Sequence, residues 1–343
     1  MKVLYAIQGT GNGHISRALE IAPLLLKKAD TDILISGCQT EMQFPNDVKY
    51  RLKGLGFIFG KRGGIDFWST YRKSDIAQFK KDIGALPVEK YDVVINDFEP
   101  VSAWAARKKG VPCIALSHQS AVLQPYSPQP KNVDPLGINI LRHYAPTDRQ
   151  IGFHFQSYNS NIYTPVVRRE IRNLKISNDG HYLVYLPSYN DEKIIAALSQ
   201  LPDVNWHVFS THSHHAYQTG NISIFPINNE RFIDSLARCE GVLCGAGFET
   251  PAESLFLGKK LMVIPMKNQY EQACNAASLG EMGVPILKDL KTKKLHEINS
   301  WLNSTIKIKV NYPDQTELII DKILADNLTN NYQRNLRDIM ERY

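Results

Sequence analysis

Residues 244–276 read CGAGFETPAESLFLGKKLMVIPMKNQYEQACNA, and they predict a glycine-rich turn, a helix, a buried strand, a proline-ended loop and a second helix. A strand-to-helix turn of this kind aims backbone N–H groups and the positive end of a helix at one point, which suits a diphosphate. Glu253 and Glu271 lie just beyond the turn, where their carboxylates could accept hydrogen bonds from hydroxyl groups. Amides for phosphate and acids for hydroxyls together favour a sugar-nucleotide site.

The whole chain alternates short Val/Ile/Leu runs with segments of helical period, which indicates an α/β fold with parallel sheets. The expected strands are KVLYAI (2–7), TDILISG (31–37), YDVVIND (91–97), VPCIALS (111–117), HYLVYLP (181–187), WHVFS (206–210), GVLC (241–244) and KLMVIP (260–265). Helices are expected near 14–29, 75–83, 100–109, 191–200, 230–238, 250–257, 270–280 and 313–325. Because the series restarts at residue 181 in the same way as at residue 2, we expect two similar doubly wound domains.

The length of 343 residues suits two domains of about 150 residues each. The connection is expected near 164–180, because this stretch carries Pro165, alternating charge and the turn Asn178-Asp179-Gly180. We therefore predict a first domain over residues 1–165, a second over 166–328 and an amphipathic helix within 329–343.

Composition and charge disfavour several classes of protein. No apolar run approaches the ~20 residues needed to cross a bilayer, and MKVLYAI lacks the pattern of a secretory signal. The five cysteines fit neither a zinc pattern nor a disulfide framework, so we expect a cytoplasmic location. The net charge of +6 comes without a basic tail or an RNA-binding motif, so no nucleic-acid partner is expected.

Three pieces of the chain carry a family resemblance: GFETPAES (247–254), LGKKLMVIP (257–265) and EQACNA (271–276). Their order and spacing resemble the donor-binding region of nucleotide-sugar glycosyltransferases of GT-B fold, which include the UDP-glycosyltransferases and the bacterial GlcNAc transferase that makes the last lipid-linked peptidoglycan precursor. The resemblance covers residues 241–283 well, residues 3–26 moderately and the rest by general organisation. It implies two Rossmann-like domains facing a cleft, with the acceptor on the first, the nucleotide sugar on the second, and 329–343 packed back on the first.

A first glycine loop, QGTGNGHISRALEIA (8–22), follows the first predicted strand and opens a helix. Its glycines let the backbone turn tightly and approach a ligand. The spacing is G-x-G-x-G rather than G-x-G-x-x-G, and the second strand, ILISGC, does not end in the acidic residue that grips a ribose. Hydride transfer is therefore disfavoured.

His14 stands where this loop meets the helix N-terminus, at the ligand edge of an open α/β sheet. A neutral imidazole there could take a proton from an acceptor hydroxyl, but His14 could equally be an ordinary helix residue or bind an acceptor phosphate. The resemblance implies the first role, because GNGHISRAL (11–19) is similar to the motif that carries the catalytic histidine of the family. It also implies that Gly11, Asn12 and Gly13 lie on the acceptor side. Relatives often have proline where Arg17 stands, which leaves the acceptor side open.

Three more residues follow strands at the same edge. Asp97 ends YDVVIND, and by resemblance to the plant-type enzymes it steadies His14; alternatively, it caps the helix that begins near Pro100. His118 and Gln119 follow VPCIALS and are expected to contact the acceptor. A structural turn histidine is the alternative for His118.

The donor residues have a local alternative as well. Thr250-Pro251-Ala252-Glu253 is also a capping box, which alone would explain Glu253 by a contribution of about 1 kcal/mol to helix stability. The resemblance implies instead that Glu253 holds the nucleotide ribose, that the amides of 247–250 receive the diphosphate, and that Glu271 and Gln272 bind sugar hydroxyls. The donor set is Ser188, Gly245, Gly247, Phe248, Glu249, Thr250, Glu253, Glu271, Gln272 and Asn275, with Ser188 as a further phosphate contact and Asn275 as a brace for the sugar loop. The base is expected to lie against PINNERF (226–232). The resemblance implies that the nucleotide is UDP.

No metal ion and no cofactor is expected. The D-x-D sequence Asp30-Thr31-Asp32 lies between a helix and the second strand, at the edge opposite the ligand, so we interpret it as a turn. A helix N-terminus and its amides would neutralise a leaving diphosphate without magnesium.

The segment 56–73 interleaves five aromatic with four basic side chains. It could contact a membrane near a lipid-linked acceptor, or its aromatics could simply cover the domain core. The proline-rich segment 125–135 is expected to be a loop that borders the acceptor cleft.

The sequence therefore predicts an inverting, metal-independent glycosyltransferase that moves a sugar from a UDP-sugar to an unknown hydroxyl acceptor, lipid-linked or of the cell envelope. One alternative is an isomerase resembling the UDP-GlcNAc 2-epimerases, which share the fold. The other is a sugar-nucleotide-binding protein without catalysis. Turnover with donor alone, or with donor plus acceptor, separates the three.

Overall fold

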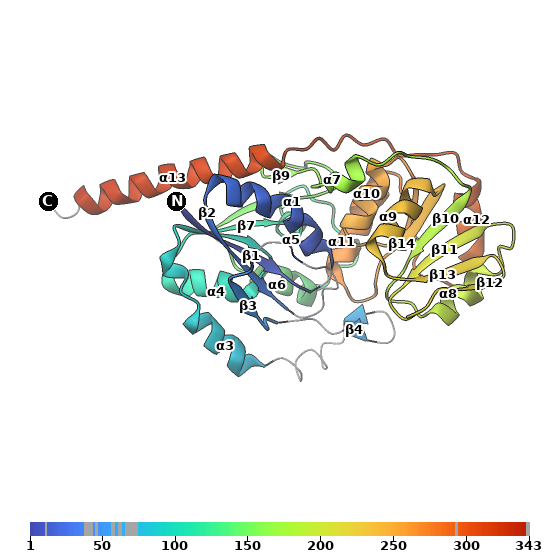
Figure 1. The fold of residues 1–343 in the computed structure, drawn as a ribbon, viewed down its shortest axis with the longest axis horizontal. Helices are drawn as coiled ribbons and strands as arrows, with labels where there is room; N and C mark the ends of the chain where they lie inside the picture. The colour runs from blue at the N-terminus through green and yellow to red at the C-terminus, as the bar shows by residue number, and fades with distance from the viewer. Residues whose placement is uncertain are drawn as a thin grey trace.

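The computed structural model describes residues 1–10, 12–37, 44, 47–55, 59–60, 64–65, 75–291 and 294–340. Gly11 and most of segment 56–73 lie outside this part of the chain, and side chains after residue 328 are not described. The described chain forms two large sheets side by side, each flanked by helices, and a small two-stranded sheet made of β4 (Phe59–Gly60) and β5 (Gly64–Ile65) (Figure 1).

The first sheet has seven parallel strands in the order β3-β2-β1-β6-β7-β8-β9. Its strands are β1 (Lys2–Gln8), β2 (Asp30–Ser36), β3 (Tyr50–Leu52), β6 (Val93–Asp97), β7 (Cys113–Ser117), β8 (Arg149–Phe153) and β9 (Ile162–Tyr163). Its helices are α1 (Asn12–Lys28), α3 (Ile76–Ala85), α4 (Pro100–Lys109), α5 (Gln119–Val122) and α6 (Pro135–His143), with a 3-10 turn η1 (Val88–Lys90).

The second sheet has six strands in the order β12-β13-β11-β10-β14-β15, parallel except for the edge strand β12. Its strands are β10 (His181–Tyr185), β11 (Asn205–Ser210), β12 (Tyr217–Thr219), β13 (Ile222–Pro226), β14 (Gly241–Gly245) and β15 (Lys260–Ile264). The helices are α7 (Arg169–Arg172), α8 (Asp191–Leu198), α9 (Asn229–Arg238), α10 (Glu249–Phe256), α11 (Tyr270–Glu281), α12 (Leu295–Asn303) and α13 (Thr316–Met340).

In each sheet the strand order reverses at the first strand, and this reversal predicts where a ligand binds. In the first sheet β1 lies between β2 and β6, and in the second β10 lies between β11 and β14. Open α/β sheets bind ligands in the crevice outside the carboxyl ends of such neighbouring strands. The loops after β1 and β6 in one sheet, and after β10 and β14 in the other, are therefore the expected ligand-binding loops.

The sequence pattern missed several strands, including β8 and β13. The β8 stretch RQIGF begins with two polar residues and has only three buried positions. The β13 stretch ISIFP alternates buried and half-buried residues and ends in proline. Both are short and lie toward the outside of a sheet, where an apolar run is not required. The Asp30–Asp32 stretch, interpreted as a turn, begins strand β2, where Asp32 pairs with Lys49.

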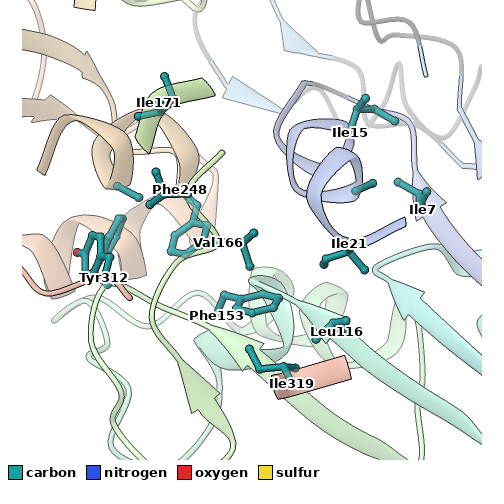
Figure 2. Packing of buried hydrophobic residues seen from close by; sticks show 14 of the residues in the cluster. Ile7, Ile15, Ile21, Leu116, Phe153, Val166, Ile171, Phe248, Tyr312 and Ile319 are labelled. Atoms are coloured by element: carbon teal, nitrogen blue, oxygen red, sulfur yellow. The ribbon is translucent and has the colours of Figure 1, made fainter. Parts of the chain in front are cut away.

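A continuous apolar core joins the two halves of the molecule. Phe153 of β8, Val166 of the connection, Phe248 before α10 and Ile319 of α13 are all buried in one cluster (Figure 2). Because burial of such side chains contributes about 1.5–3 kcal/mol each, we expect the halves to hold each other in a defined orientation.

Helix α13 lies against the first half of the molecule after residues 304–315 have crossed back from α12 (Figure 1). Lys28 of α1 pairs with Glu317 and Asp321, and Arg149 pairs with Asp326. One helix, Thr316–Met340, thus joins most of the two segments that were predicted as separate helices, 313–325 and 329–343. No helix among the described residues is both long enough and apolar enough to cross a membrane.

Candidate active site

A cavity of about 710 Å³ lies where the binding loops of the two sheets meet. From the first half it is lined by Thr10, Asn12, Gly13, His14, Ser16, Arg17, His118 and Gln119. From the second half, including the connection, it is lined by Arg168, Tyr185, Pro187, Ile227, Asn228, Asn229, Phe232, Gly245, Gly247, Phe248, Glu249, Thr250, Glu253, Gln269, Glu271 and Gln272. Most of the predicted acceptor and donor residues thus surround one space, whereas Ser188 and Asn275 do not line it.

His14 is oriented by Asp97. The distance from His14 Nδ1 to Asp97 Oδ1 is 2.8 Å, and the Asp97 carboxylate is completely buried. A carboxylate can only accept, so Nδ1 carries the proton and donates it to Asp97. In a neutral ring the other nitrogen, Nε2, is then the acceptor, and it lies 3.5 Å from the side-chain nitrogen of Gln119. His14 therefore has the tautomer that a general base requires.

The alternative that Asp97 caps helix α4 is wrong. Glu99 is the cap, and its carboxylate accepts hydrogen bonds from the amides of Val101 (2.8 Å) and Ser102 (2.6 Å). Phe98, between the two acids, has φ of 55°, a left-handed conformation that costs free energy in a bulky residue. This turn leaves Asp97 at the end of β6 while Glu99 reaches the helix.

Arg17 is the second partner of Asp97. Its Nε donates to Asp97 Oδ2 (2.9 Å), its Nη2 to Asp97 Oδ1 (2.7 Å), and its Nη1 to Glu249 Oε1 (2.6 Å). Burial alone would raise the pKa of Asp97, but the charge of Arg17 and the hydrogen bonds from Arg17 and His14 hold it below its usual value. Asp97 therefore stays ionised, and Arg17 connects it to the donor side of the cavity.

His118 acts as a connection between the two halves. Its ring stacks on Phe248, with centroids 3.9 Å apart and an interplanar angle of 6°. Nδ1 lies 2.8 Å from the carbonyl oxygen of Phe153, and Nε2 lies 2.7 Å from Asn275 Oδ1. Both ring nitrogens are thus used within the protein, which supports the structural alternative for this histidine over an acceptor contact.

The capping-box interpretation of 250–253 is wrong. Helix α10 begins at Glu249 after Phe248, without a side-chain cap, and Glu253 Oε1 and Oε2 instead accept from Arg168 Nε (2.6 Å) and Nη2 (2.9 Å). The amides at the start of α10 therefore have no side-chain acceptor at the cap. A Cβ built on Gly247 would meet no atom within 4 Å, so a ligand can approach the backbone of this loop.

The remaining donor candidates lie as follows. Glu271 Oε2 accepts from Gln119 (3.2 Å), and the side-chain oxygen of Gln272 accepts from the amide of Met266 (2.8 Å). Asn275 is buried and donates to the carbonyl of Ala246, so it braces the glycine turn rather than the sugar loop. Ser188 is not among the residues that line the cavity, whereas Tyr185, at the end of β10, and Pro187, in the following loop, are.

A smaller cavity of about 120 Å³ adjoins His14. Phe98, Ile140, Leu141 and Tyr144 line it together with polar residues that include Gln8 and Gln119. The Phe98 ring lies 4.9 Å from the Tyr144 ring, centroid to centroid. This space suits a flat or apolar molecule that presents a polar group to His14.

Within the described ranges, no group of three or more His, Cys, Asp or Glu side chains could hold a metal ion. Tyr185, Pro187 and Gln269 line the cavity without a sequence signal, and so does the charged residue Arg168, while the sequence assigns no role to Arg17. Both arginines make their contacts with residues far away in the chain, Glu253 for Arg168 and Asp97 and Glu249 for Arg17. A local pattern carries no sign of such pairs.

The family model for glycosyl transferase family 1 matches residues 1–305. The chain belongs to this family. It is therefore a glycosyltransferase, as the resemblance implied. No curated protein matches the chain at a significant level.

Solved structures confirm the GT-B fold. MurG of Acinetobacter baumannii has 16% sequence identity and a TM-score of 0.57, with 94% of this chain and 99% of that one covered. UGT89C1 of Arabidopsis thaliana, solved with UDP-L-rhamnose, has 12% identity and a TM-score of 0.59, with 92% of each chain covered. UGT2 of Phytolacca americana, solved with UDP-2fluoro-glucose and pterostilbene, has 13% identity and a TM-score of 0.58, with 87% of this chain and 89% of that one covered.

Proposed function

We propose that this glycosyltransferase inverts the anomeric centre, works without a metal ion and transfers a sugar from a UDP-sugar to a hydroxyl acceptor. The observation that carries the proposal is the His14–Asp97 pair, whose histidine lines the same cavity as the N-terminus of α10. A base on one side and an anion-stabilising helix end on the other are what a single displacement requires.

In this mechanism the acceptor lies in the smaller cavity, with its hydroxyl near His14 Nε2. His14 removes the proton as the oxygen attacks the anomeric carbon, and Asp97 stabilises the imidazolium that forms. UDP leaves toward the amides and positive end of α10, which supply the stabilisation that a metal would otherwise provide. The apolar lining of the smaller cavity favours an acceptor with a flat or apolar body, a lipid-linked one included.

Uridine is proposed as the base because UGT2 and UGT89C1, which share the fold, were solved with UDP-linked sugars. Ile227, Asn228 and Phe232 lie in or directly after the loop that we expect to hold the base. Glu253, fixed by Arg168, is positioned to accept from ribose hydroxyls with its remaining lone pairs.

The proposal is tested by incubating the protein with UDP-sugars and a panel of hydroxylated aromatic and isoprenoid acceptors, with and without EDTA. We expect a glycoside of inverted anomeric configuration only when donor and acceptor are both present, at a rate that EDTA does not change. Conversion of the donor sugar without an acceptor would instead support the epimerase alternative. Binding of UDP without any conversion would support the non-catalytic one.

Glu271 offers a test of the sugar contact. Replacing it with glutamine removes a charged acceptor, so we expect the donor KM to rise about 10–100-fold, as hydrogen bonds to charged groups contribute about 1.5–3 kcal/mol. The affinity for UDP, which lacks the sugar, should stay the same. Glu281→Gln, at the exposed end of the same helix, is the control. Equal loss of UDP and UDP-sugar affinity in Glu271→Gln would contradict the role in sugar binding.

A further inference from the structure

The ion pair between Arg17 and Glu249 joins α1 to the start of α10. The Arg17 side chain is 2% exposed and that of Glu249 is 18% exposed, and both line the large cavity. A Cβ placed on Gly13 would lie 3.1 Å from Glu249 Cγ, so the first turn of α1 packs closely on this acid. The pair therefore sits between the His14–Asp97 pair and the loop with free amides.

Glu249 places an acidic side chain at the helix end where the diphosphate is proposed to bind. It is the first residue of α10, whose amides and positive end favour an anion, and its carboxylate supplies one from within the protein. A diphosphate bound at the same helix end would bring more negative charge close to that carboxylate, and like charges so near each other repel strongly. Glu249 and a diphosphate therefore cannot both be satisfied there as anions.

Arg17 is suited to either partner. Two of its nitrogens, Nε and Nη2, are held by Asp97, so the guanidinium keeps its place whichever anion takes Nη1. Guanidinium groups match phosphate oxygens in geometry, and their charge remains because the pKa of Arg17 is raised by Asp97 and Glu249, against the effect of burial. Nη1 points to Glu249 at 2.6 Å, on the donor side.

We propose that Glu249 and the donor diphosphate compete for Nη1 of Arg17, and that Arg17 binds the diphosphate once Glu249 has taken up a proton. This inference rests on the proposed function, and it adds a positioning and charge-neutralising role for Arg17 that the resemblance left open. The exchange moves one proton from solvent to the Glu249 carboxylate, where it forms an O–H bond. No other covalent bond of the protein changes.

The burial of Glu249 and the charges around it determine the pH range in which the exchange occurs. Burial raises the pKa of Glu249 to about 8, with Glu253 and Asp97 adding to the rise and Arg17 and Arg168 opposing it. Below pH 8 the carboxyl group is largely neutral and does not oppose a diphosphate. Above pH 8 it ionises and competes, so affinity for UDP should fall as the pH rises.

The test is isothermal titration of the whole protein with UDP at pH 7, 8 and 9. With a pKa near 8, binding to the parent protein should weaken about tenfold between pH 7 and pH 9 and should take up about half a proton at pH 8, measured in two buffers of different ionisation enthalpy. Glu249→Gln should lack this tenfold weakening and take up no proton at pH 8. Ionisation of uracil affects both proteins alike and therefore cancels.

Glu192→Gln, an exposed acid in the first turn of α8, is the matched control and should behave like the parent. Arg17→Lys keeps the positive charge beside Asp97 but lacks the planar guanidinium with its several N–H donors. It should therefore weaken UDP binding at pH 7, while the melting temperature shows a folded protein. Equal pH dependence in the parent and in Glu249→Gln would overturn the competition while leaving a UDP-binding glycosyltransferase. Failure of the parent to bind UDP at pH 7 would overturn the uridine donor itself, and the competition with it.

Discussion

Replacing His14 with alanine is expected to lower the rate of sugar transfer by roughly 10²–10⁴-fold, the usual contribution of a general base. The affinity for UDP should change by less than about twofold, because the diphosphate is proposed to bind at the start of α10 and at Arg17, and not at His14. Single-turnover rates with saturating donor measure the chemical step, and titration with UDP measures the binding.

His215→Ala, at an exposed histidine of the second half, is the control and should keep the parent rate. A His14→Ala protein with the parent rate would remove the proposed base. A His14→Ala protein that no longer binds UDP would show that His14 belongs to the donor site instead.

Asp97→Asn is expected to have the second large effect, on both stability and rate. The buried Arg17 would lose a charged partner that accepts two of its hydrogen bonds. Removing one partner of a buried ion pair lowers the free energy of unfolding by about 3–5 kcal/mol, so the melting temperature should fall clearly. The rate should fall as well, because asparagine no longer stabilises the imidazolium of His14 or fixes its tautomer.

A double variant separates the two effects. Asp97→Asn combined with Arg17→Met removes the uncompensated buried charge, so stability should partly return while the rate stays low. Asp203→Asn, on an exposed loop, should change neither. Recovery of the rate in the double variant would show that Asp97 acts on catalysis only through the packing of Arg17.

The sequence by itself predicted the architecture and the place of the site. Alternation of apolar runs with helical segments distinguishes parallel sheets from other folds, and the carboxyl ends of parallel strands meet at one edge. Residues that follow such strands, including His14, Asp97 and Gln119, were therefore expected to lie together, and they do line or adjoin one cavity. These are consequences of backbone periodicity, which is local and can be predicted from neighbouring residues.

The tertiary structure alone decided the partners of the long and charged side chains. Local rules offered the cap of α4 as an alternative for Asp97 and a capping box as an alternative for Glu253, but Glu99 caps α4 and Glu253 binds Arg168. Buried charges require opposite charges, and the chain brings these from distant segments. Arg17 could not be assigned for the same reason, since its two acids come from the neighbouring strand β6 and from the other half of the molecule. Which acid meets which base depends on how the two sheets are placed, and no local pattern encodes that.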